Sequence, residues 1–258
     1  MIDMHCHLLP GVDDGPVDWE ESIRLVRQGA ADGIKAVLVT PHLAELDLEQ
    51  VEIIRRRFSE LVKRVNEEGI RMKLILGAEV MFQFGLEKLR ELGVGVFGKR
   101  YFLLELVPFG FVPPRLEDIL FRLHLEGLHP ILAHIERYPG LIGNPERLER
   151  LARMGVFFQV NAGTFLGGSG SSAARTVLRL ARMGLVHVVG SDAHNAVSRP
   201  MRMSEARIVV ERNVGMEVAR RIFEEIPEAL LAGERVNASP PMVEEEGILK
   251  KMARRFLR

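Results

Sequence analysis

Two histidines stand two residues apart near the start of the chain, where His5 and His7 flank Cys6. If this segment is a strand, the alternation of side chains turns both imidazoles to one side, about 6–7 Å apart along the chain. Two imidazoles so placed can bind one metal ion. Asp192 and His194 repeat this spacing near the other end of the chain. A single H-x-H pair is more often incidental than metal-binding, so the residues that accompany it decide its meaning.

Short apolar runs, rich in β-branched residues, predict seven strands, and apolar residues at helical spacing fill most of the segments between them. The strand candidates are residues 2–5, 36–40, 73–78, 101–106, 130–133, 156–160 and 187–190. The helix candidates are residues 20–32, 48–68, 116–126, 145–154 and 173–183. Several of these helices stop at a glycine just before the next strand, which is the expected left-handed cap. This alternation predicts a parallel sheet that helices cover, either doubly wound or closed into a barrel.

Most of the predicted strands are followed by a residue type that binds metals. In both kinds of parallel sheet, functional residues gather at the carboxyl ends of the strands. Six of the seven strands bring such residues to this rim, and the candidate ligands are His5, His7, Asp14, His42, Glu79, Glu105, His134, Asp192 and His194. A glutamate among them, taken alone, would be interpreted as a buried carboxylate paired with an arginine. The other three histidines, His124, His129 and His187, are interpreted as structural.

The ligand types restrict the metal. Imidazole and carboxylate groups without thiolate favour manganese, iron or zinc, and Cys6 should point away from the site by strand alternation. Nine ligands exceed the four to six donors, water included, that one ion uses. Two or three ions are therefore expected, some bridged by Glu79 or another carboxylate.

Arginines lie just beyond two of the candidate ligands. Arg137 follows His134 by three residues, and Arg199 follows His194 by five. Guanidinium groups bind phosphate oxygens in pairs, so both arginines are predicted to contact a phosphate, with Arg115 a less favoured third candidate. A phosphatase with a cysteine nucleophile is excluded, because that signature needs an arginine five residues after the cysteine.

Composition limits the remaining classes. The chain has 258 residues, which fits one α/β barrel or two small domains. Lys plus Arg equals Asp plus Glu at 35 each, so nothing global indicates nucleic acid or an anionic membrane as the main partner, and any basic site must be local. No stretch reaches the roughly 20 apolar residues of a transmembrane helix. A single cysteine indicates a reducing compartment, and we expect the cytoplasm.

In this order, the motifs strongly resemble the PHP (polymerase and histidinol phosphatase) superfamily, and within it the bacterial manganese-dependent protein-tyrosine phosphatases of the CpsB/YwqE type, which act in capsule and exopolysaccharide regulation. The resemblance rests on His5-x-His7, Leu-Pro-Gly-Val-Asp-Asp-Gly at 9–15, Thr-Pro-His at 40–42, Gly-Ala-Glu at 77–79, Leu-Glu at 104–105, Ala-His-Ile-Glu-Arg at 133–137 and Gly-Ser-Asp-Ala-His-Asn at 190–195. It runs from residue 1 to about residue 235.

The resemblance implies a distorted (β/α)7, TIM-like barrel, with the nine candidate ligands holding up to three ions, usually manganese, at the carboxyl-terminal rim of the strands. It implies a phosphotyrosyl protein as substrate, with a membrane-associated bacterial tyrosine kinase as the partner by analogy. Residues 236–258 depart from the family pattern. They form an expected tail whose basic, amphipathic segment at 248–258 is interpreted as a frayed or packed terminal helix.

The predicted reaction is in-line attack on phosphorus by a hydroxide held between two metals, with Asp192 and His194 among the ligands and Arg137 and Arg199 on the phosphate. Acidification through the imidazole pKa near 6.5 should remove metal and activity together. A phosphatase of histidinol phosphate or another small phosphoester would use the same site. A PHP-type exonuclease, a catalytically silent metal-binding module and a homo-oligomer also stay open.

Overall fold

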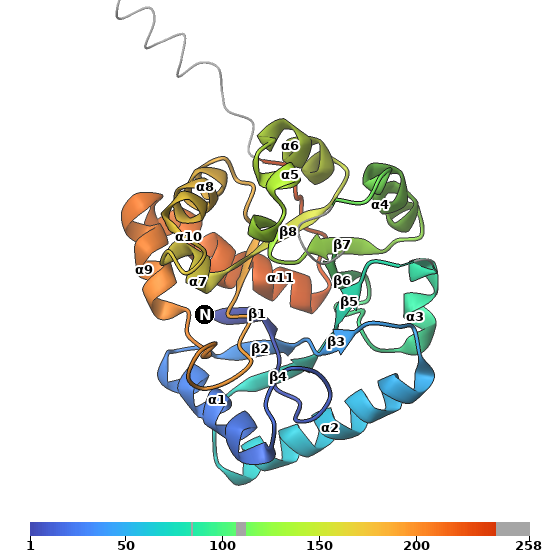
Figure 1. Cartoon of the computed structure of the whole chain (residues 1–258), viewed down its shortest axis with the longest axis vertical. Helices are drawn as coiled ribbons and strands as arrows, with labels where there is room; N and C mark the ends of the chain where they lie inside the picture. The colour runs from blue at the N-terminus through green and yellow to red at the C-terminus, as the bar shows by residue number, and fades with distance from the viewer. Residues whose placement is uncertain (84, 107–111, 241–258) are drawn as a thin grey trace, which may run out of the picture.

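Parallel strands curl around a common axis, and helices lie on their outer side (Figure 1). The computed structural model describes residues 1–83, 85–106 and 112–240. Its strands pair in the orders β1-β2-β4 and β3-β5-β6-β7-β8-β9. They are β1 (Ile2–Cys6), β2 (Ala36–Val39), β3 (His42–Leu43), β4 (Lys73–Leu76), β5 (Glu79–Met81), β6 (Tyr101–Glu105), β7 (His129–Leu132), β8 (Phe157–Asn161) and β9 (Val188–Gly190).

The first and last strands are neighbours. A parallel bridge joins Cys6 to Ala193, and the backbone N–H of His7 donates to the carbonyl oxygen of Ala193 at 2.9 Å. The strands therefore close into a ring, which confirms the expected barrel and excludes the doubly wound sheet.

Two of the seven expected strands are interrupted, which is why nine are observed. Pro41, which has no backbone N–H to donate, separates β2 from β3. Gly77 separates β4 from β5, and a Cβ there would lie 3.0 Å from the side chain of Leu38. Because β2 pairs with β4 and β3 with β5, the four short strands occupy only two positions in the ring. The ring therefore has seven strand positions, as expected.

The five expected helices are confirmed to within about two residues. The α-helices are α1 (Trp19–Ala31), α2 (Leu48–Glu67), α3 (Leu89–Leu92), α4 (Leu116–Leu125), α5 (Pro139–Ile142), α6 (Pro145–Arg153), α7 (Ala162–Phe165), α8 (Ser171–Arg182), α9 (Ser204–Asn213), α10 (Met216–Arg220) and α11 (Ile226–Ala232). The glycine caps are also confirmed, since Gly33 and Gly155 have φ of 87° and 86°. The helices beyond residue 200 were not predicted.

Apolar residues fill the amino-terminal half of the ring. One buried cluster inside it joins Met4, Leu38, Leu103, Ile131, Phe157 and Val188, with Ile226 and Leu230 of α11 closing the end. Alternation along β6 places Leu103 in this cluster and directs Glu105, two residues later, to the same side at the opposite rim. A larger cluster packs the outer helices against the ring. The apolar interior thus ends below the carboxyl-terminal rim, where Glu105 lies.

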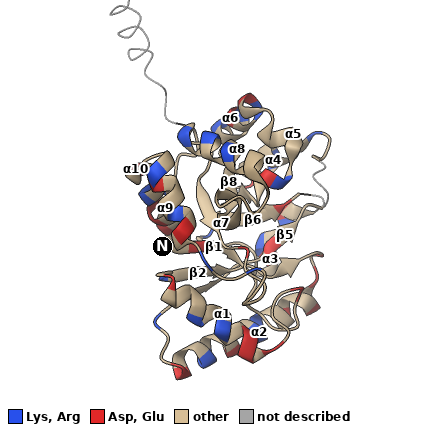
Figure 2. Ribbon diagram, turned by 60° about the vertical axis from the view of Figure 1, so that its left-hand side comes forward, with Lys and Arg blue, Asp and Glu red and all other residues tan. Residues whose placement is uncertain are grey.

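Acidic and basic side chains are interspersed over the outer helices (Figure 2). Among the described residues, no helix combines the length and apolar character needed to cross a bilayer. After α11 the chain still packs on the barrel, because the Tyr101 hydroxyl donates to the carbonyl oxygen of Glu234 at 2.5 Å. The predicted tail helix at 248–258 lies outside the described residues, and the domain boundary at residue 235 stays a prediction.

Candidate metal centre

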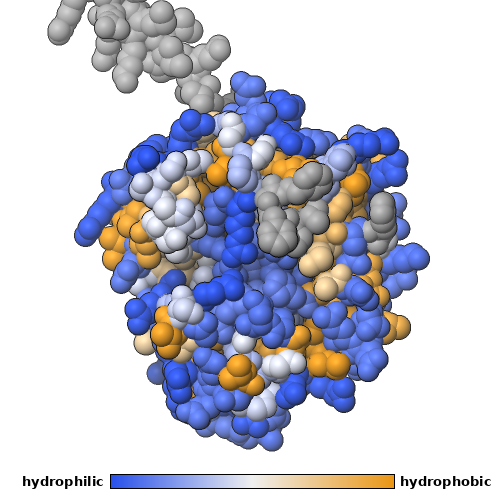
Figure 3. Space-filling model, in the orientation of Figure 1, coloured by the Kyte–Doolittle hydropathy of each residue, from blue (hydrophilic) through white to orange (hydrophobic). Residues whose placement is uncertain are grey.

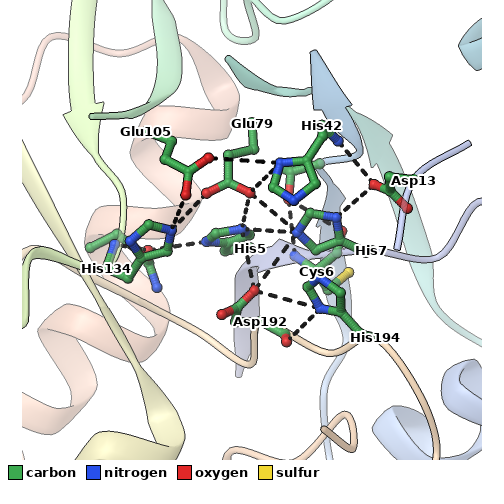
Figure 4. A network of polar contacts seen from close by, with 12 residues as sticks. His5, Cys6, His7, Asp13, His42, Glu79, Glu105, His134, Asp192 and His194 are labelled. Atoms are coloured by element: carbon green, nitrogen blue, oxygen red, sulfur yellow. Dashed lines mark hydrogen bonds and ion pairs between the residues drawn. The ribbon is translucent and has the colours of Figure 1, made fainter. Parts of the chain in front are cut away.

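All nine predicted ligands converge at the carboxyl-terminal rim of the ring, and Figure 4 shows most of them pointing toward a common centre. His5 and Glu105 lie at the ends of β1 and β6, His42 and Glu79 begin the short strands β3 and β5, and the loops after β1, β7 and β9 carry the others. Their ligand atoms form four overlapping groups, each within 4.8 Å: His7, Asp14, His42 and His194; His5, Glu79 and His134; His5, His7 and Asp192; His42, Glu79 and Glu105. The space-filling view shows hydrophilic residues in the middle of this face (Figure 3).

Four ligand atoms surround one point at the centre. The Nε2 atoms of His5 and His7 lie 3.2 Å apart. They lie 3.1 and 3.3 Å from Glu79 Oε2, and 3.6 and 3.7 Å from Asp192 Oδ1. Ligands bonded at about 2.1 Å to one tetrahedral or octahedral ion are roughly 3.0–3.4 Å from one another. The separations among His5, His7 and Glu79 fall within this range, and those to Asp192 exceed it by 0.2–0.3 Å, so a small movement of Asp192 would complete a site for a single cation.

The imidazole tautomers support the same conclusion. His5 Nδ1 lies 3.1 Å from Gln159 Oε1, and His7 Nδ1 lies 2.7 Å from Asp13 Oδ2. Gln159 Oε1 also accepts from the backbone N–H of His134, so it is an acceptor and each Nδ1 is the donor. In the neutral imidazoles, both Nε2 atoms then present lone pairs toward two carboxylates. Once the imidazoles are neutral, four acceptor atoms converge, and this matches the donor set of a metal ion.

Glu79 connects the central point to the rest of the site. The Glu79 side chain is 1% exposed, and its Oε1 lies 2.8 Å from His134 Nε2 while its Oε2 lies 3.2 Å from His42 Nδ1. On one side, His134 Nε2 is 3.5 Å from Glu105 Oε1. On the other, Asp14 Oδ1 lies 3.4 Å from His42 Nε2 and 3.1 Å from His194 Nε2. These residues would suffice to hold further ions on either side of the centre, and Glu79 would be within reach of each side.

Backbone strain positions two of the ligands. His134 and Asp192 follow β7 and β9 with φ of 30° and 53°, a region that residues with a Cβ seldom adopt. Each such backbone conformation lowers stability by on the order of 1–3 kcal/mol, and it persists where the surrounding structure holds it. Both side chains are buried. The strain is therefore located at the ends of the strands that carry site residues.

The environment sets the protonation of each group. Burial and the neighbouring Glu79 carboxylate raise the pKa of Glu105 to about 7. Burial opposes the ionisation of Glu79, yet His5 and a hydrogen bond from His134 hold its pKa well below the usual range. Burial and His7 lower the pKa of His194 to about 4, so this imidazole offers a lone pair at neutral pH.

A proton is expected to leave the site when metal binds. Burial lowers the pKa of His7, but hydrogen bonds to Asp13 and Glu79 outweigh it and raise the pKa to about 10 in the metal-free protein. His7 therefore holds a proton at pH 7 that a metal must displace, so metal affinity should rise with pH up to about 10. The proton-bound pair stabilises the metal-free fold fully below pH ~6.5, and this contribution is lost as pH rises through the folded pKa.

Calorimetric titration of metal into chelator-treated protein tests whether metal binding displaces the proton of His7. Repeated at pH 7 in two buffers of different ionisation enthalpy, it should show release of at least one proton. Identical heats in both buffers would show that no proton is displaced.

Three polar residues of the site were not predicted. Asp13 accepts from His7 and, at 2.9 Å, from the backbone N–H of His42. Gln159 and Asn161 come from β8, the strand without a predicted ligand, and the Asn161 amide donates to Asp192 Oδ2 at 2.7 Å. Two signals in the sequence could have indicated them. Asp13 directly precedes a predicted ligand, and Gln159 and Asn161 are two amides at i, i+2 spacing at the end of a strand. These residues orient ligands and do not face the central point themselves.

Arg137 and Arg199 stand at the mouth of the site. Their guanidinium groups lie 2.5 and 2.8 Å from Asp192 Oδ2, with side chains 46% and 36% exposed. Both line a cleft of about 480 Å³ beside the rim, together with Ser169 and Arg202. Arg115 instead pairs with Asp118 at 2.9 Å and is 77% exposed, so it contacts the start of α4 rather than the site.

Comparison with known proteins assigns the chain to a family. Residues 1–232 match the family described as "Capsular polysaccharide synthesis, CpsB/CapC". Tyrosine-protein phosphatase YwqE of Bacillus subtilis is 33% identical over 245 residues, covering 93% of this chain and 95% of the relative. Tyrosine-protein phosphatase CpsB of Streptococcus pneumoniae is 30% identical over 242 residues, covering 90% and 98%.

Comparison with solved structures supports the same family. A structure from work on B. subtilis YwqE and S. pneumoniae CpsB, described as unique metal-dependent tyrosine phosphatases, superposes with a TM-score of 0.84 and 31% identity over 94% of this chain and 99% of that one. Histidinol phosphate phosphatase of Lactococcus lactis superposes with a TM-score of 0.52 at 13% identity, over 82% and 93%, and shares the fold. Fold, motifs and coverage agree, and the chain belongs to the CpsB/CapC family of capsular polysaccharide synthesis proteins.

Proposed function

We propose that this protein is a metal-dependent phosphomonoesterase that removes phosphate from phosphotyrosyl protein. The observation that carries the proposal is the set of four converging acceptor atoms from His5, His7, Glu79 and Asp192, with two arginines above it. A cation centre beneath guanidinium groups suits a phosphate dianion. The names of the relatives, which are tyrosine-protein phosphatases, support the phenolic ester.

The nine converging side chains would hold two or three ions, and we propose manganese, because the donors are imidazole and carboxylate without thiolate. Bound there, the ions would supply Lewis acidity and a nucleophile at neutral pH. Gln159 and Asp13 fix the imidazole tautomers that the ligands need. Iron or zinc would suit the same donors, and metal analysis of protein purified without added metal distinguishes them.

Arg137 and Arg199 would hold the phosphate. Both guanidinium groups lie on Asp192, so the arriving phosphate oxygens would take over contacts that the carboxylate makes now. Charge-assisted N–H bonds from two sides orient the phosphorus and neutralise the charge that grows on its oxygens. A phenolate leaving group, with a pKa near 10, needs less protonation than an alkoxide.

We propose that the protein acts in the cytoplasm. We also propose that its phosphotyrosyl substrate is produced by a bacterial tyrosine kinase. The family description, which names capsular polysaccharide synthesis, supports this role in capsule or exopolysaccharide control. Pull-down with the phosphorylated tail of a tyrosine kinase from the same organism tests the partnership, with the unphosphorylated tail as control.

Cys6 is expected to have no part in the reaction. It is fully buried, its Sγ lies 3.8 Å from the carbonyl oxygen of Leu38, and burial raises the thiol pKa well above its usual range. We expect Cys6→Ser to keep kcat/KM within about twofold of wild type while costing roughly 1 kcal/mol of stability. A collapse in rate with metal retained would assign the cysteine a chemical role.

The reaction is tested with chelator-treated protein to which manganese, zinc, magnesium or iron is returned. Substrates are a phosphotyrosyl peptide, the matched phosphoseryl peptide and histidinol phosphate. Metal-restored activity that favours the phosphotyrosyl peptide supports the proposal. Activity on histidinol phosphate alone would replace the substrate but keep the site, and full metal loading without turnover would indicate a binding module.

A further inference from the structure

A second polar cavity lies at the opposite end of the barrel. It has a volume of about 650 Å³ and is lined by Arg90, Lys99, Arg100, His124, His129 and Arg235, together with Tyr101. No carboxylate is among its lining residues. We refer to it as the basic pocket. In a chain with equal numbers of acidic and basic residues, such a concentration of positive charge is local and specific.

The basic pocket is separate from the metal centre. Tyr101 and His129 are the first residues of β6 and β7, and Lys99 and Arg100 directly precede β6. Glu105, at the metal rim, is four residues further along β6, which corresponds to roughly 13 Å of extended chain. Phosphoryl chemistry at the carboxyl-terminal rim therefore does not account for the charges at this end.

The cations of the basic pocket have no acidic partner among the residues that the structure describes. Within the described residues, neither Arg90, Lys99, Arg100 nor Arg235 forms an ion pair, whereas outer-helix arginines such as Arg147 do. Arg100 Nε and His124 Nδ1 are buried atoms without a hydrogen-bond partner there. Burial and the surrounding cations, His124 and Arg100 first, lower the pKa of His129 to about 4. Like charges held together in this way repel one another until an anion lies between them.

The turn before β6 holds two of these cations in place. The backbone N–H of Phe97 donates to the carbonyl oxygen of Tyr101 at 2.8 Å, closing a turn in which Gly98 and Lys99 have φ of 53° and 68°. A Cβ on Gly98 would lie 2.2 Å from the carbonyl oxygen of Leu230, so the turn is wedged against α11. Lysine is an uncommon residue in this left-handed position, where asparagine or glycine costs less. The chain thus accepts strain to keep a lysine at the edge of the pocket.

We propose that the basic pocket binds the diphosphate group of an anionic ligand. Two tetrahedral phosphates with three or more negative charges would meet four cationic side chains, and arginine binds phosphate oxygens bidentately. The volume exceeds what one phosphate fills, and the rings of Tyr101 and His129, 5.6 Å apart, offer a wall against which a further group can pack. Inorganic diphosphate and a nucleoside diphosphate share this chemistry.

Calorimetric titration of the full-length protein with inorganic pyrophosphate, at physiological salt, tests the proposal. Three double variants separate the sites: Arg100→Gln with Arg235→Gln in the basic pocket, Arg137→Gln with Arg199→Gln at the metal rim, and Arg175→Gln with Arg179→Gln on α8 as a control with the same loss of charge. Repeating the titration with ADP identifies the source, because tighter binding than pyrophosphate indicates a nucleotide and weaker binding indicates free diphosphate.

We expect the basic-pocket variant alone to lose a pyrophosphate-binding event, by about tenfold or more in affinity, while its phosphatase rate without ligand stays at the wild-type value. Loss confined to the metal-rim variant would show that pyrophosphate binds only there and would overturn the proposal. Equal loss in the α8 control, or no binding to wild type at millimolar pyrophosphate, would overturn it as well. Circular dichroism confirms that each variant is folded.

Discussion

Glu79→Gln is expected to lower kcat/KM for a phosphotyrosyl peptide by at least about a thousandfold, or ~4 kcal/mol of transition-state stabilisation. The Glu79 side chain is 1% exposed and lies within 3.3 Å of His5, His7, His42 and His134. Two of the four groups of ligand atoms therefore lose the charge that they share. The amide keeps the shape and removes the negative charge that two or more cations need. Bound metal, counted by elemental analysis, should fall with the rate.

Glu91→Gln, on the exposed surface of α3, is the matched control and should change neither metal content nor rate. A Glu79→Gln protein that kept its metal and most of its activity would show that the central acceptor set does not hold the catalytic ions. A folded variant is required for this comparison, and thermal unfolding in the presence of metal establishes it.

Arg199→Gln and Arg137→Gln are each expected to lower kcat/KM by about 10²–10³-fold while metal content stays at the wild-type level. The two guanidinium groups contact Asp192 Oδ2 and stand between the centre and solvent, where they can reach phosphate without binding metal. Lysine at either position should recover part of the rate, because it keeps the charge and loses the two-pronged contact. Steady-state kinetics beside metal analysis separates the two effects.

Arg115→Gln removes the same charge from a residue that pairs with Asp118, and its rate should equal that of wild type. A variant of Arg137 or Arg199 that lost metal as well as rate would assign the arginine a structural role through Asp192. If the double variant were no slower than either single one, the two residues would act as a unit on the phosphate.

The barrel and the convergence of the nine candidate ligands were accessible from sequence because they depend on local patterns. Apolar runs, glycines after helices and acceptor residues at strand ends repeat along the chain, and parallel strands bring their carboxyl ends to one rim. Knowing that His5 ends a strand and that Asp192 follows another therefore placed them together without knowledge of the strand order. The structure brings all nine predicted ligands within reach of one another.

Other features of the site and of the strands depend on three-dimensional contacts, which the spacing of residues along the sequence does not indicate. Asp13 and Asp14 are adjacent acids, and only the path of the loop directs Asp13 to His7 and Asp14 to His42 and His194. Gln159 is an amide in an apolar strand, and its role follows from contacts with residues 154 and 25 positions away. The breaks at Pro41 and Gly77 lie side by side in two neighbouring strands, which keep the same pairing register on both sides of them. Such tertiary effects override local propensity.

The closure of β1 against the segment after β9 also sets the order of events during synthesis. Asp3 Oδ1 accepts from the backbone N–H of Ser191, 188 residues later, so the two halves of the central site are separated by most of the chain. At roughly 5–20 residues per second, the ribosome needs about 10–40 s to join them. Until then His5 and His7 lack the closed ring and the Asp192 carboxylate. The full donor set of the centre therefore exists only after nearly three quarters of the chain has been made.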